Sequence, residues 1–277
     1  MKLFRKYGSL IFILAMTFCS FLYIGREEEV MGMVRHLPVI MYHSVRENEE
    51  GKYIIPIKKL EEDFKYIKSK GYEAVTAREV AEALKGNKPL PKKPIIITFD
   101  DGYYNNLKYA LPLIEKYDLK AVISVIGKCI EEYDEVSDRN PAYACLNSED
   151  ISELLQTGRI EIGNHSYDMH RQGARRGTMR IKGEDVEKYK KAFCDDAKSC
   201  YDRVYKNTGV KIKTYTYPYG QITGESVSFL KEMGYDVYFT CYEKINILDE
   251  ISFPLPLGRF NRDGNLTTDD FMEKAGI

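Results

Sequence analysis

Short β-rich runs alternate with amphipathic helical patterns along most of this 277-residue chain, and this alternation constrains its fold more than any other feature. It is typical of an α/β protein with mostly parallel strands. Strands are predicted at residues 39–42, 73–75, 95–99, 121–126, 160–163, 214–217 and 237–241. Seven strands interleaved with helices favour a barrel, although an open doubly wound sheet would fit the same pattern.

Helical periodicity is clearest at residues 57–70, 148–156 and 185–206. Ser148 is expected to cap the second of these helices, and Pro112 is expected near the first turn of another helix that reaches Tyr117. Since no internal repeat and no clear linker interrupts the pattern, residues 34–277 are predicted to form one domain.

Residues 1–30 have the layout of an export segment. Lys2, Arg5 and Lys6 precede an uncharged run over residues 7–25, which as a helix would be about 28 Å long and could just cross a bilayer. Tyr23 stands where a signal peptidase requires a small side chain, which favours an uncleaved membrane anchor over a cleaved signal peptide. The domain is therefore expected outside the cytoplasm, either anchored to the membrane or secreted.

Charge and cysteine content narrow the partners further. Four of the 41 basic residues lie within residues 1–26. The rest of the chain therefore has 37 basic and 42 acidic residues, a net charge of −5, which argues against a nucleic-acid partner.

Five cysteines lie beyond the export segment, so they cannot all pair within the chain. Cys129 and Cys145 flank a polar stretch and are the most plausible disulfide.

Two adjacent carboxylates follow the buried-strand run at residues 95–99. Asp100 and Asp101 come at its C-terminal end, where catalytic groups collect in α/β barrels. Their side chains point in different directions, so one can hold a cation while the other faces a reacting water. Taken alone, Asp-Asp-Gly is also an ordinary turn signal.

A second strand end strengthens the catalytic interpretation. The run 160–163 leads into His165, and His170 follows five residues later, a spacing that allows the two rings to converge only through a turn. Two histidines and one aspartate from another strand end form a two-nitrogen, one-oxygen ligand set with open positions. That set is typical of a catalytic metal site rather than a structural one.

These residues resemble the motifs of the polysaccharide deacetylases with a NodB homology domain, also called carbohydrate esterase family 4. The resemblance is carried by Thr98-Phe99-Asp100-Asp101-Gly102, by His165-Ser166 through His170 and by Tyr217-Pro218-Tyr219-Gly220, and it spans about residues 34–260. It implies a distorted (β/α) barrel and a metal-dependent hydrolase that removes acetyl groups from N-acetylated polysaccharide at the cell envelope.

The resemblance also implies a role for each motif residue. Asp100 would be the general base, and Asp101, His165 and His170 would bind one divalent metal ion, usually zinc. The backbone N–H of Tyr219 would help to hold the oxyanion.

The chain departs from the family pattern in three places. Its two histidines are five residues apart rather than four, which is similar to the branch that deacetylates biofilm poly-N-acetylglucosamine. Thr216 stands where the family usually has an arginine that orients the base. The late Leu-x-His motif that supplies a general acid is absent, and Leu257-Gly258-Arg259 lies near where it would fall.

His43 is the predicted substitute for the missing acid, because expelling an amine requires a proton at the leaving nitrogen. It stands at the end of the first predicted strand, and a Tyr-His pair at this place also resembles the biofilm-polymer branch. His36 precedes that strand and has no predicted role.

Other functions fit parts of the same pattern. An O-acetyl esterase would use the same apparatus, and the missing motifs would suit a non-catalytic, membrane-tethered sugar-binding protein. A two-metal phosphohydrolase would need a second cluster of ligands at strand ends, for which only two spare histidines are present.

The basic stretch at residues 171–182 is expected to be a solvated loop, with contact to an anionic polymer as the alternative.

Overall fold

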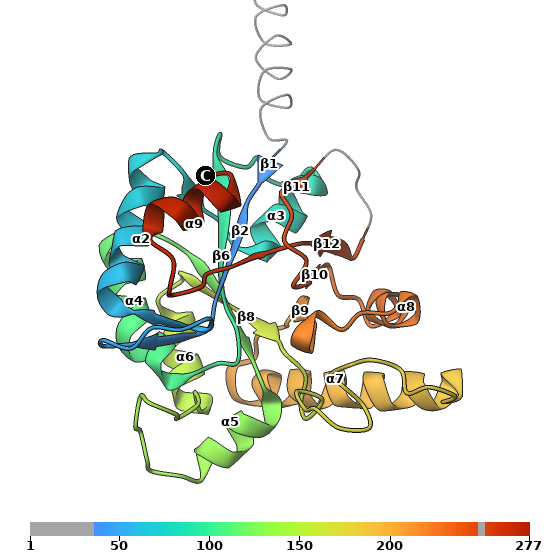
Figure 1. Ribbon diagram of the computed structural model, residues 1–277. Coiled ribbons are helices and arrows are strands. Elements are labelled where there is room, and N and C mark those ends of the chain that lie inside the picture. The colour runs from blue at the N-terminus through green and yellow to red at the C-terminus, as the bar shows by residue number, and fades with distance from the viewer. Residues whose placement is uncertain (1–35, 249–252) are drawn as a thin grey trace, which may run out of the picture.

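The computed structural model describes residues 36–248 and 253–277, and a curled parallel sheet lies at its centre (Figure 1). Its strands are β2 (Val39–Tyr42), β5 (Glu73–Ala74), β6 (Pro94–Phe99), β7 (Ala121–Val125), β8 (Ile160–Asn164), β9 (Thr214–Thr216), β10 (Val237–Phe239), β12 (Leu255–Leu257) and β13 (Phe260–Asn261). They pair in the order β12-β10-β9-β8-β7-β6-β2-β13, with β5 beside β6, and every pairing is parallel.

The two edge strands of this order, β12 and β13, are consecutive in the chain and only Gly258 and Arg259 separate them. The sheet must therefore curl until its edges come near each other, and the predicted (β/α) barrel of distorted form is confirmed. All seven predicted strands are present, whereas β12 and β13 were not anticipated. Pro256 explains the omission of β12, because proline is tolerated in a strand only at a sheet edge, and β12 lies at one.

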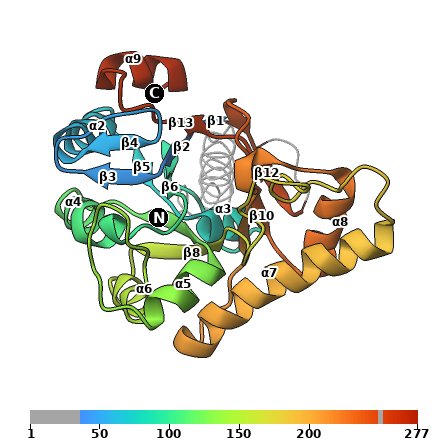
Figure 2. The ribbon, with the colours of Figure 1, turned by 60° about the horizontal axis from the view of Figure 1, so that its bottom comes forward.

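Helices follow most of the strands. They are α2 (Ile57–Ser69), α3 (Ala77–Leu84), α4 (Leu111–Lys116), α5 (Gly127–Asp134), α6 (Ser148–Gln156), α7 (Val186–Thr208), α8 (Gly224–Glu232) and α9 (Thr268–Ala275), with short turns η1 (Asn106–Ala110) and η2 (Pro218–Gly220). Most of them cover the outside of the sheet, whereas α3 packs against its inner face (Figure 2). The predicted helices are confirmed as α2, α6, α7 and α4. The predicted cap is wrong by one residue: Asn147, in a capping box with Asp150, caps α6 because its side chain accepts the Asp150 N–H.

Two small strand pairs flank the main sheet. In one, β1 (His36–Leu37) runs antiparallel to β11 (Asn246–Ile247). In the other, β3 (Ser44–Arg46) pairs in parallel with β4 (Ile54–Pro56), directly after the end of β2.

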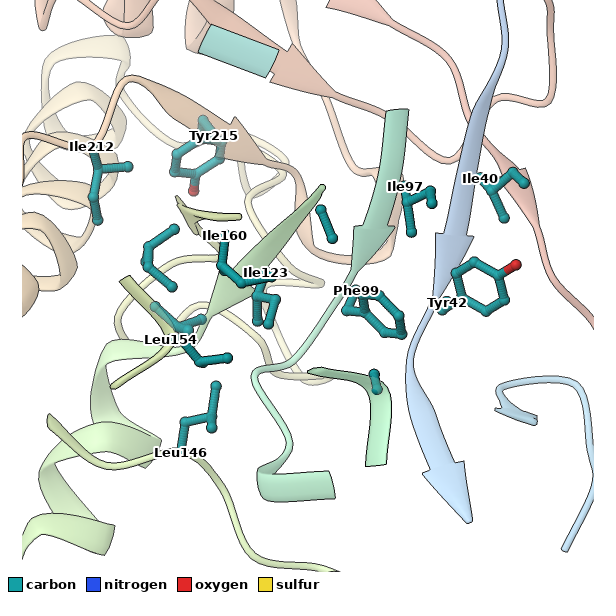
Figure 3. Packing of buried hydrophobic residues seen from close by; sticks show 14 of the residues in the cluster. Ile40, Tyr42, Ile97, Phe99, Ile123, Leu146, Leu154, Ile160, Ile212 and Tyr215 are labelled. Carbon is teal, nitrogen blue, oxygen red and sulfur yellow. The ribbon is translucent and has the colours of Figure 1, made fainter. Parts of the chain in front are cut away.

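Alternate residues of the central strands β6 and β7 enter two different apolar clusters. Together with side chains of the outer helix α2, Ile40, Ile97 and Ile123 lie in one cluster (Figure 3). The residues between them, such as Ile96 and Val122, face the inside of the curl together with side chains of α3. This period of two with both faces buried is what a parallel sheet requires.

The inner face becomes polar toward the carboxyl ends of the strands. Thr98 donates a hydrogen bond to the carbonyl of Ile40, and the hydroxyls of Ser124 and Thr216 lie 2.6 Å apart. Gly163 leaves the room for this layer, since a Cβ there would come within 2.7 Å of Ser124 Oγ. Beyond this layer of hydroxyl groups, at the carboxyl ends of the strands, the inner face carries charged side chains.

Among the residues that the structure describes, no helix combines the length and the apolar character needed to cross a membrane. The predicted export segment at residues 1–30 lies outside the described residues.

Candidate active site

The carboxyl ends of the parallel strands bring the predicted site residues to one end of the sheet. His43 directly follows β2, Asp100 and Asp101 follow β6, and His165 follows β8. His170 and Tyr219 come from the next loops along the chain, and their rings lie 4.5 Å apart. All six residues named from the sequence therefore lie at a single location.

Asp101, His165 and His170 form the candidate metal site. Asp101 Oδ1 lies 3.4 Å from His165 Nε2 and 3.3 Å from His170 Nε2. Ligands bound tetrahedrally at about 2.0–2.1 Å from a zinc ion are about 3.3 Å apart, so both separations match those of a chelating set. Asp101 Oδ1 is buried and has no hydrogen-bond partner, which leaves it free for a cation.

The second nitrogen of His165 fixes the orientation of its ring. Nδ1 lies 2.8 Å from the carbonyl oxygen of Thr216, so it carries the proton and leaves Nε2 as a lone-pair donor. His165 is 2% exposed, whereas Asp101 and His170 are partly open to solvent. The residues present therefore fit a divalent metal ion with free coordination positions on the open side.

The protonation states of Asp101 and His170 also suit a cation. Burial alone would raise the pKa of Asp101, but the neighbouring histidines outweigh it and hold that pKa below its ordinary value. Burial and the adjacent His165 lower the pKa of His170 to about 4. At neutral pH, Asp101 is therefore a carboxylate and His170 is a neutral ligand.

Left-handed backbone conformations mark the turns that carry these groups. Only four non-glycine residues in the described parts of the chain have positive φ, and three of them are at this site: Asp101 (69°), Ser166 (74°) and Tyr219 (56°). Such conformations cost of order 1–3 kcal/mol each and persist only where the surroundings enforce them. Their concentration here supports a functional role for these turns.

The loop between the two histidines is held by α7. Asp196 of that helix accepts the backbone N–H groups of Tyr167 and Asp168, each at 2.8 Å. Asn164 accepts the N–H of Ser166 and donates to the carbonyl of Ala197. This anchoring gives the five-residue spacing of the histidines a defined turn, so that both rings reach Asp101.

Asp100 is bound by an arginine that the sequence interpretation left without a role. Arg259 donates from Nη1 to Asp100 Oδ1 at 2.7 Å and from Nη2 to Oδ2 at 2.8 Å. It also donates to the carbonyl of Thr240 and to Thr98 Oγ1, and its side chain is fully buried. Burial would raise the pKa of Asp100, but the Arg259 guanidinium, with His165, keeps that pKa below its ordinary value.

Arg259, in the connection between β12 and β13, therefore supplies the positive charge beside Asp100 that Thr216 cannot provide. Thr216 makes other contacts: its carbonyl oxygen accepts a hydrogen bond from His165, and its hydroxyl group is hydrogen-bonded to that of Ser124. The sequence signal was a single arginine within the apolar run 253–260, since a charge in such a run must find a buried partner.

His43 lies beside both carboxylates, which act on its charge. Asn106 Nδ2 donates to the carbonyl of His43 at 2.9 Å and so ties the end of β2 to η1. His43 Nδ1 is buried without a hydrogen-bond partner, and burial lowers the pKa of the ring from its ordinary value of 6.5. His36 lies apart from this group, exposed on β1.

Asn106 was also missed by the sequence interpretation. It follows the Asp-Asp-Gly turn by only four residues, but an asparagine in a polar loop gives no sign that its amide is buried.

The basic stretch after His170 is largely paired with acids. Arg171 contacts Asp168, Arg175 contacts Glu184, and Arg180 donates to Glu225 at 3.1 Å. The guanidinium of Arg176 instead lies 5.8 Å from the ring of Tyr219. Internal pairing of three arginines favours the solvated-loop interpretation over a docking surface for an anionic polymer.

Cys129 and Cys145 are free thiols in the structure, so the expected disulfide is not formed. They are nevertheless in contact, because a hydrogen bond from Cys145 lowers the pKa of Cys129. Cys145 also forms a backbone bridge to Tyr103, next to the Asp-Asp-Gly turn.

Comparison with known proteins agrees with the geometry. The family profile described as Polysaccharide deacetylase matches residues 87–238. Poly-beta-1,6-N-acetyl-D-glucosamine N-deacetylase of Escherichia coli K12 is 24% identical over 73% of this chain and 33% of its own length. The protein of the same name from Staphylococcus aureus MRSA252 is 25% identical over 74% of this chain and 67% of its own length.

A solved structure extends the similarity to the fold. IcaB from Ammonifex degensii is 25% identical and superposes with a TM-score of 0.71, covering 87% of this chain and 96% of its own. This chain spans about a third of the length of the Escherichia coli relative. With the family profile matched over more than half of its length, and with the motif residues gathered at one end of the sheet, this chain belongs to the polysaccharide deacetylase family.

Proposed function

We propose that this chain is a metal-dependent N-deacetylase of N-acetylglucosamine polysaccharide, with a β-1,6-linked polymer as its substrate. One observation carries the proposal: a buried carboxylate, Asp100, is held by Arg259 directly beside the chelating set of Asp101, His165 and His170. The names of the relatives and the five-residue histidine spacing support the choice of polymer.

Asp101, His165 and His170 would hold the metal ion. A divalent ion bound there supplies Lewis-acid polarisation of the acetyl carbonyl and lowers the pKa of a water molecule. The three ligand atoms lie within 4.8 Å of one another, and the hydrogen bond from His165 Nδ1 to Thr216 keeps one of them aimed at the ion. Zinc is the proposed ion, since catalytic zinc is held by two histidines and one carboxylate in other enzymes.

Asp100 would be the general base. Its lowered pKa keeps it ionised at neutral pH, so it can accept the proton of the attacking water. The fork of Arg259 occupies one lone pair on each oxygen and fixes the plane of the carboxylate, which leaves the remaining lone pairs for that proton.

Tyr219 and His43 would complete the reaction. The left-handed turn at Tyr219 carries the backbone N–H that would stabilise the oxyanion formed when water attacks the acetyl carbon. As the carbon–nitrogen bond breaks, protonated His43 would donate its proton to the leaving amine, giving acetate and a glucosamine unit.

The proposed location is outside the cytoplasm, with residues 1–30 as a membrane anchor. The basic residues before the uncharged run 7–25 support this orientation. Fractionation of cells should recover the full-length chain with membranes, and it should be cleaved by protease added from outside.

The proposal is tested by acetate release from a panel of acetylated glycans. We expect the purified full-length chain to release acetate from β-1,6-linked N-acetylglucosamine oligomers, to lose this activity after chelation and to regain it with zinc. Release from O-acetylated glycans alone would identify an esterase. Sugar binding without any release would identify a non-catalytic sugar-binding protein.

A further inference from the structure

One tyrosine lies against the proposed general acid and is half open to solvent. The ring of Tyr53 is centred 4.7 Å from that of His43, at an interplanar angle of 59°. It is 49% exposed, whereas the following Ile54 is half-buried and Ile55 is buried. Lys52 Nζ lies 5.4 Å from the centre of the same ring, so the exposed part of Tyr53 is an aromatic surface beside both the proposed acid and a positive charge. Such a surface suits a ligand with an apolar face and polar edges.

The backbone around Tyr53 is held from two sides, which fixes the point from which its ring extends toward His43. The N–H of Ser44, the residue after His43, donates to the carbonyl of Tyr53 at 3.1 Å. From the C-terminal side, Asn261 donates to the carbonyl of Lys52 and the N–H of Gly264 donates to the carbonyl of Gly51, both at 2.9 Å.

Close packing reinforces this connection. A Cβ at Gly264 would come within 1.9 Å of the carbonyl oxygen of Ile54, so the two segments are in direct backbone contact. The segment that carries Arg259 thus also supports the loop that carries Tyr53. The base and the tyrosine are positioned by one short stretch of chain, residues 259–264.

We propose that Tyr53 is a sugar-binding residue whose ring stacks on the N-acetylglucosamine unit undergoing deacetylation and holds its nitrogen at His43. The inference rests on the proposed function and adds a specificity determinant to it. The C–H face of a pyranose is apolar and matches an aromatic ring, whereas a small acetyl ester offers no such face. Tyr53 should therefore matter for sugar substrates and not for small esters.

The test compares Tyr53→Ala, Tyr53→Phe and Tyr205→Ala in the metal-loaded, full-length chain. Tyr205 is a matched control, since it is 43% exposed and lies on α7, where it stacks on Tyr201. In Tyr53→Ala we expect kcat/KM for β-1,6-linked N-acetylglucosamine oligomers to fall about three- to tenfold, mainly through KM. Tyr53→Phe, Tyr205→Ala and the hydrolysis of p-nitrophenyl acetate by all variants should change by less than about twofold.

Binding of the same oligomers to metal-depleted full-length chain, measured by calorimetry, separates this inference from the proposed activity. Weaker binding in Tyr53→Ala alone supports the inference even if no acetate is released, in which case only the proposed activity fails. Oligomer binding and KM that are unchanged in Tyr53→Ala overturn the inference while leaving the deacetylase proposal intact. Absence of binding in the wild type overturns it as well.

Discussion

Two buried arginine–aspartate pairs, whose arginines are three residues apart in the chain, contrast in their surroundings. Arg259 holds Asp100 at the open end of the sheet, and Arg262 holds Asp63 of α2 through Nε at 2.7 Å and Nη2 at 3.0 Å. All four side chains are almost completely buried. The two arginines stand on either side of β13 and contribute to different parts of the molecule.

The Arg262 pair forms a closed network. Asp63 also accepts hydrogen bonds from Tyr42 and Thr268, and Arg262 also donates to the carbonyls of Asp263 and Leu266. None of these side chains has an unsatisfied buried atom. The network joins β2, α2 and the start of α9.

The Arg259 pair lies instead beside two buried atoms that lack partners, His43 Nδ1 and Asp101 Oδ1. Unsatisfied polar atoms are rare in folded proteins, because each costs about 1–3 kcal/mol. A buried arginine–aspartate pair therefore has two uses in this protein. Where every polar group has a hydrogen-bond partner, the pair stabilises the fold. Where neighbouring polar atoms lack partners, it lies in a site that can bind substrate and metal.

The largest effect should come from breaking the closed network. Arg262→Met leaves the charge of Asp63 buried and unpaired, and we expect the free energy of unfolding to fall by about 3–5 kcal/mol. Denaturant titration measures this loss, and the double variant Asp63→Leu/Arg262→Met should recover part of it. Turnover per folded molecule should fall much less than in site variants, because the side chains of Arg262 and Asp63 contact neither Asp100 nor the chelating set. A loss of turnover as large as that of site variants would contradict the division between the two pairs.

On the open side, His43→Gln should lower kcat about 100-fold at acid pH while metal content is retained. Burial lowers the pKa of His43 below 6.5, and a general acid must carry its proton, so its contribution is full below that pKa and is lost as pH rises through it. The ratio of wild-type to His43→Gln kcat/KM isolates this ionisation, because other groups titrate in both proteins. We expect the ratio to fall with rising pH from below 6.5, and a ratio that is flat from pH 5 to 8 would remove His43 from the mechanism.

Conservative replacement of the two arginines sharpens the contrast. Lysine keeps the charge but loses the two-pronged geometry, so Arg259→Lys should lower kcat about tenfold without loss of metal. Arg262→Lys is the matched control and should lower stability while lowering kcat much less than Arg259→Lys does. Equal turnover in the two variants would show that the orientation of Asp100 does not limit the reaction.

The smallest effect is expected at Asn106, which acts on His43 only through its backbone carbonyl. Asn106→Ala should lower kcat by tenfold or less, with KM and metal content unchanged, because the acid is displaced but not removed. A parallel rise in KM would indicate general disruption of the site.

Much of the fold could be predicted from the sequence because its signals are local. Strand runs such as 95–99 and helices such as α2 and α7 follow from hydrophobic periodicity and flanking residues. Strand β12 could not be predicted, since Pro256 argues against a strand until the edge position is known. The curl of the sheet depends on contacts between residues more than 200 apart, such as Phe260 beside Ile40.

The candidate site likewise contains residues that could be predicted from the sequence and residues that could not. Asp100, Asp101, His165 and His170 could be found because motif spacing and strand ends are visible in the sequence. Arg259 could not be assigned, because its partner lies 159 residues away and only the closure of the sheet brings them together. Tyr53 was equally invisible, since its contact with His43 depends on the path of the loop before β4.

Adjacent carboxylates provide the most direct test of the central claim, that Asp101 belongs to a metal site and Asp100 to the base. Bound zinc per chain and acetate release from β-1,6-linked N-acetylglucosamine oligomers should be measured together in Asp100→Asn and Asp101→Asn. We predict that Asp100→Asn retains zinc and loses turnover by about a thousandfold, whereas Asp101→Asn loses both. Full zinc occupancy in Asp101→Asn, or wild-type turnover in Asp100→Asn, would contradict the account.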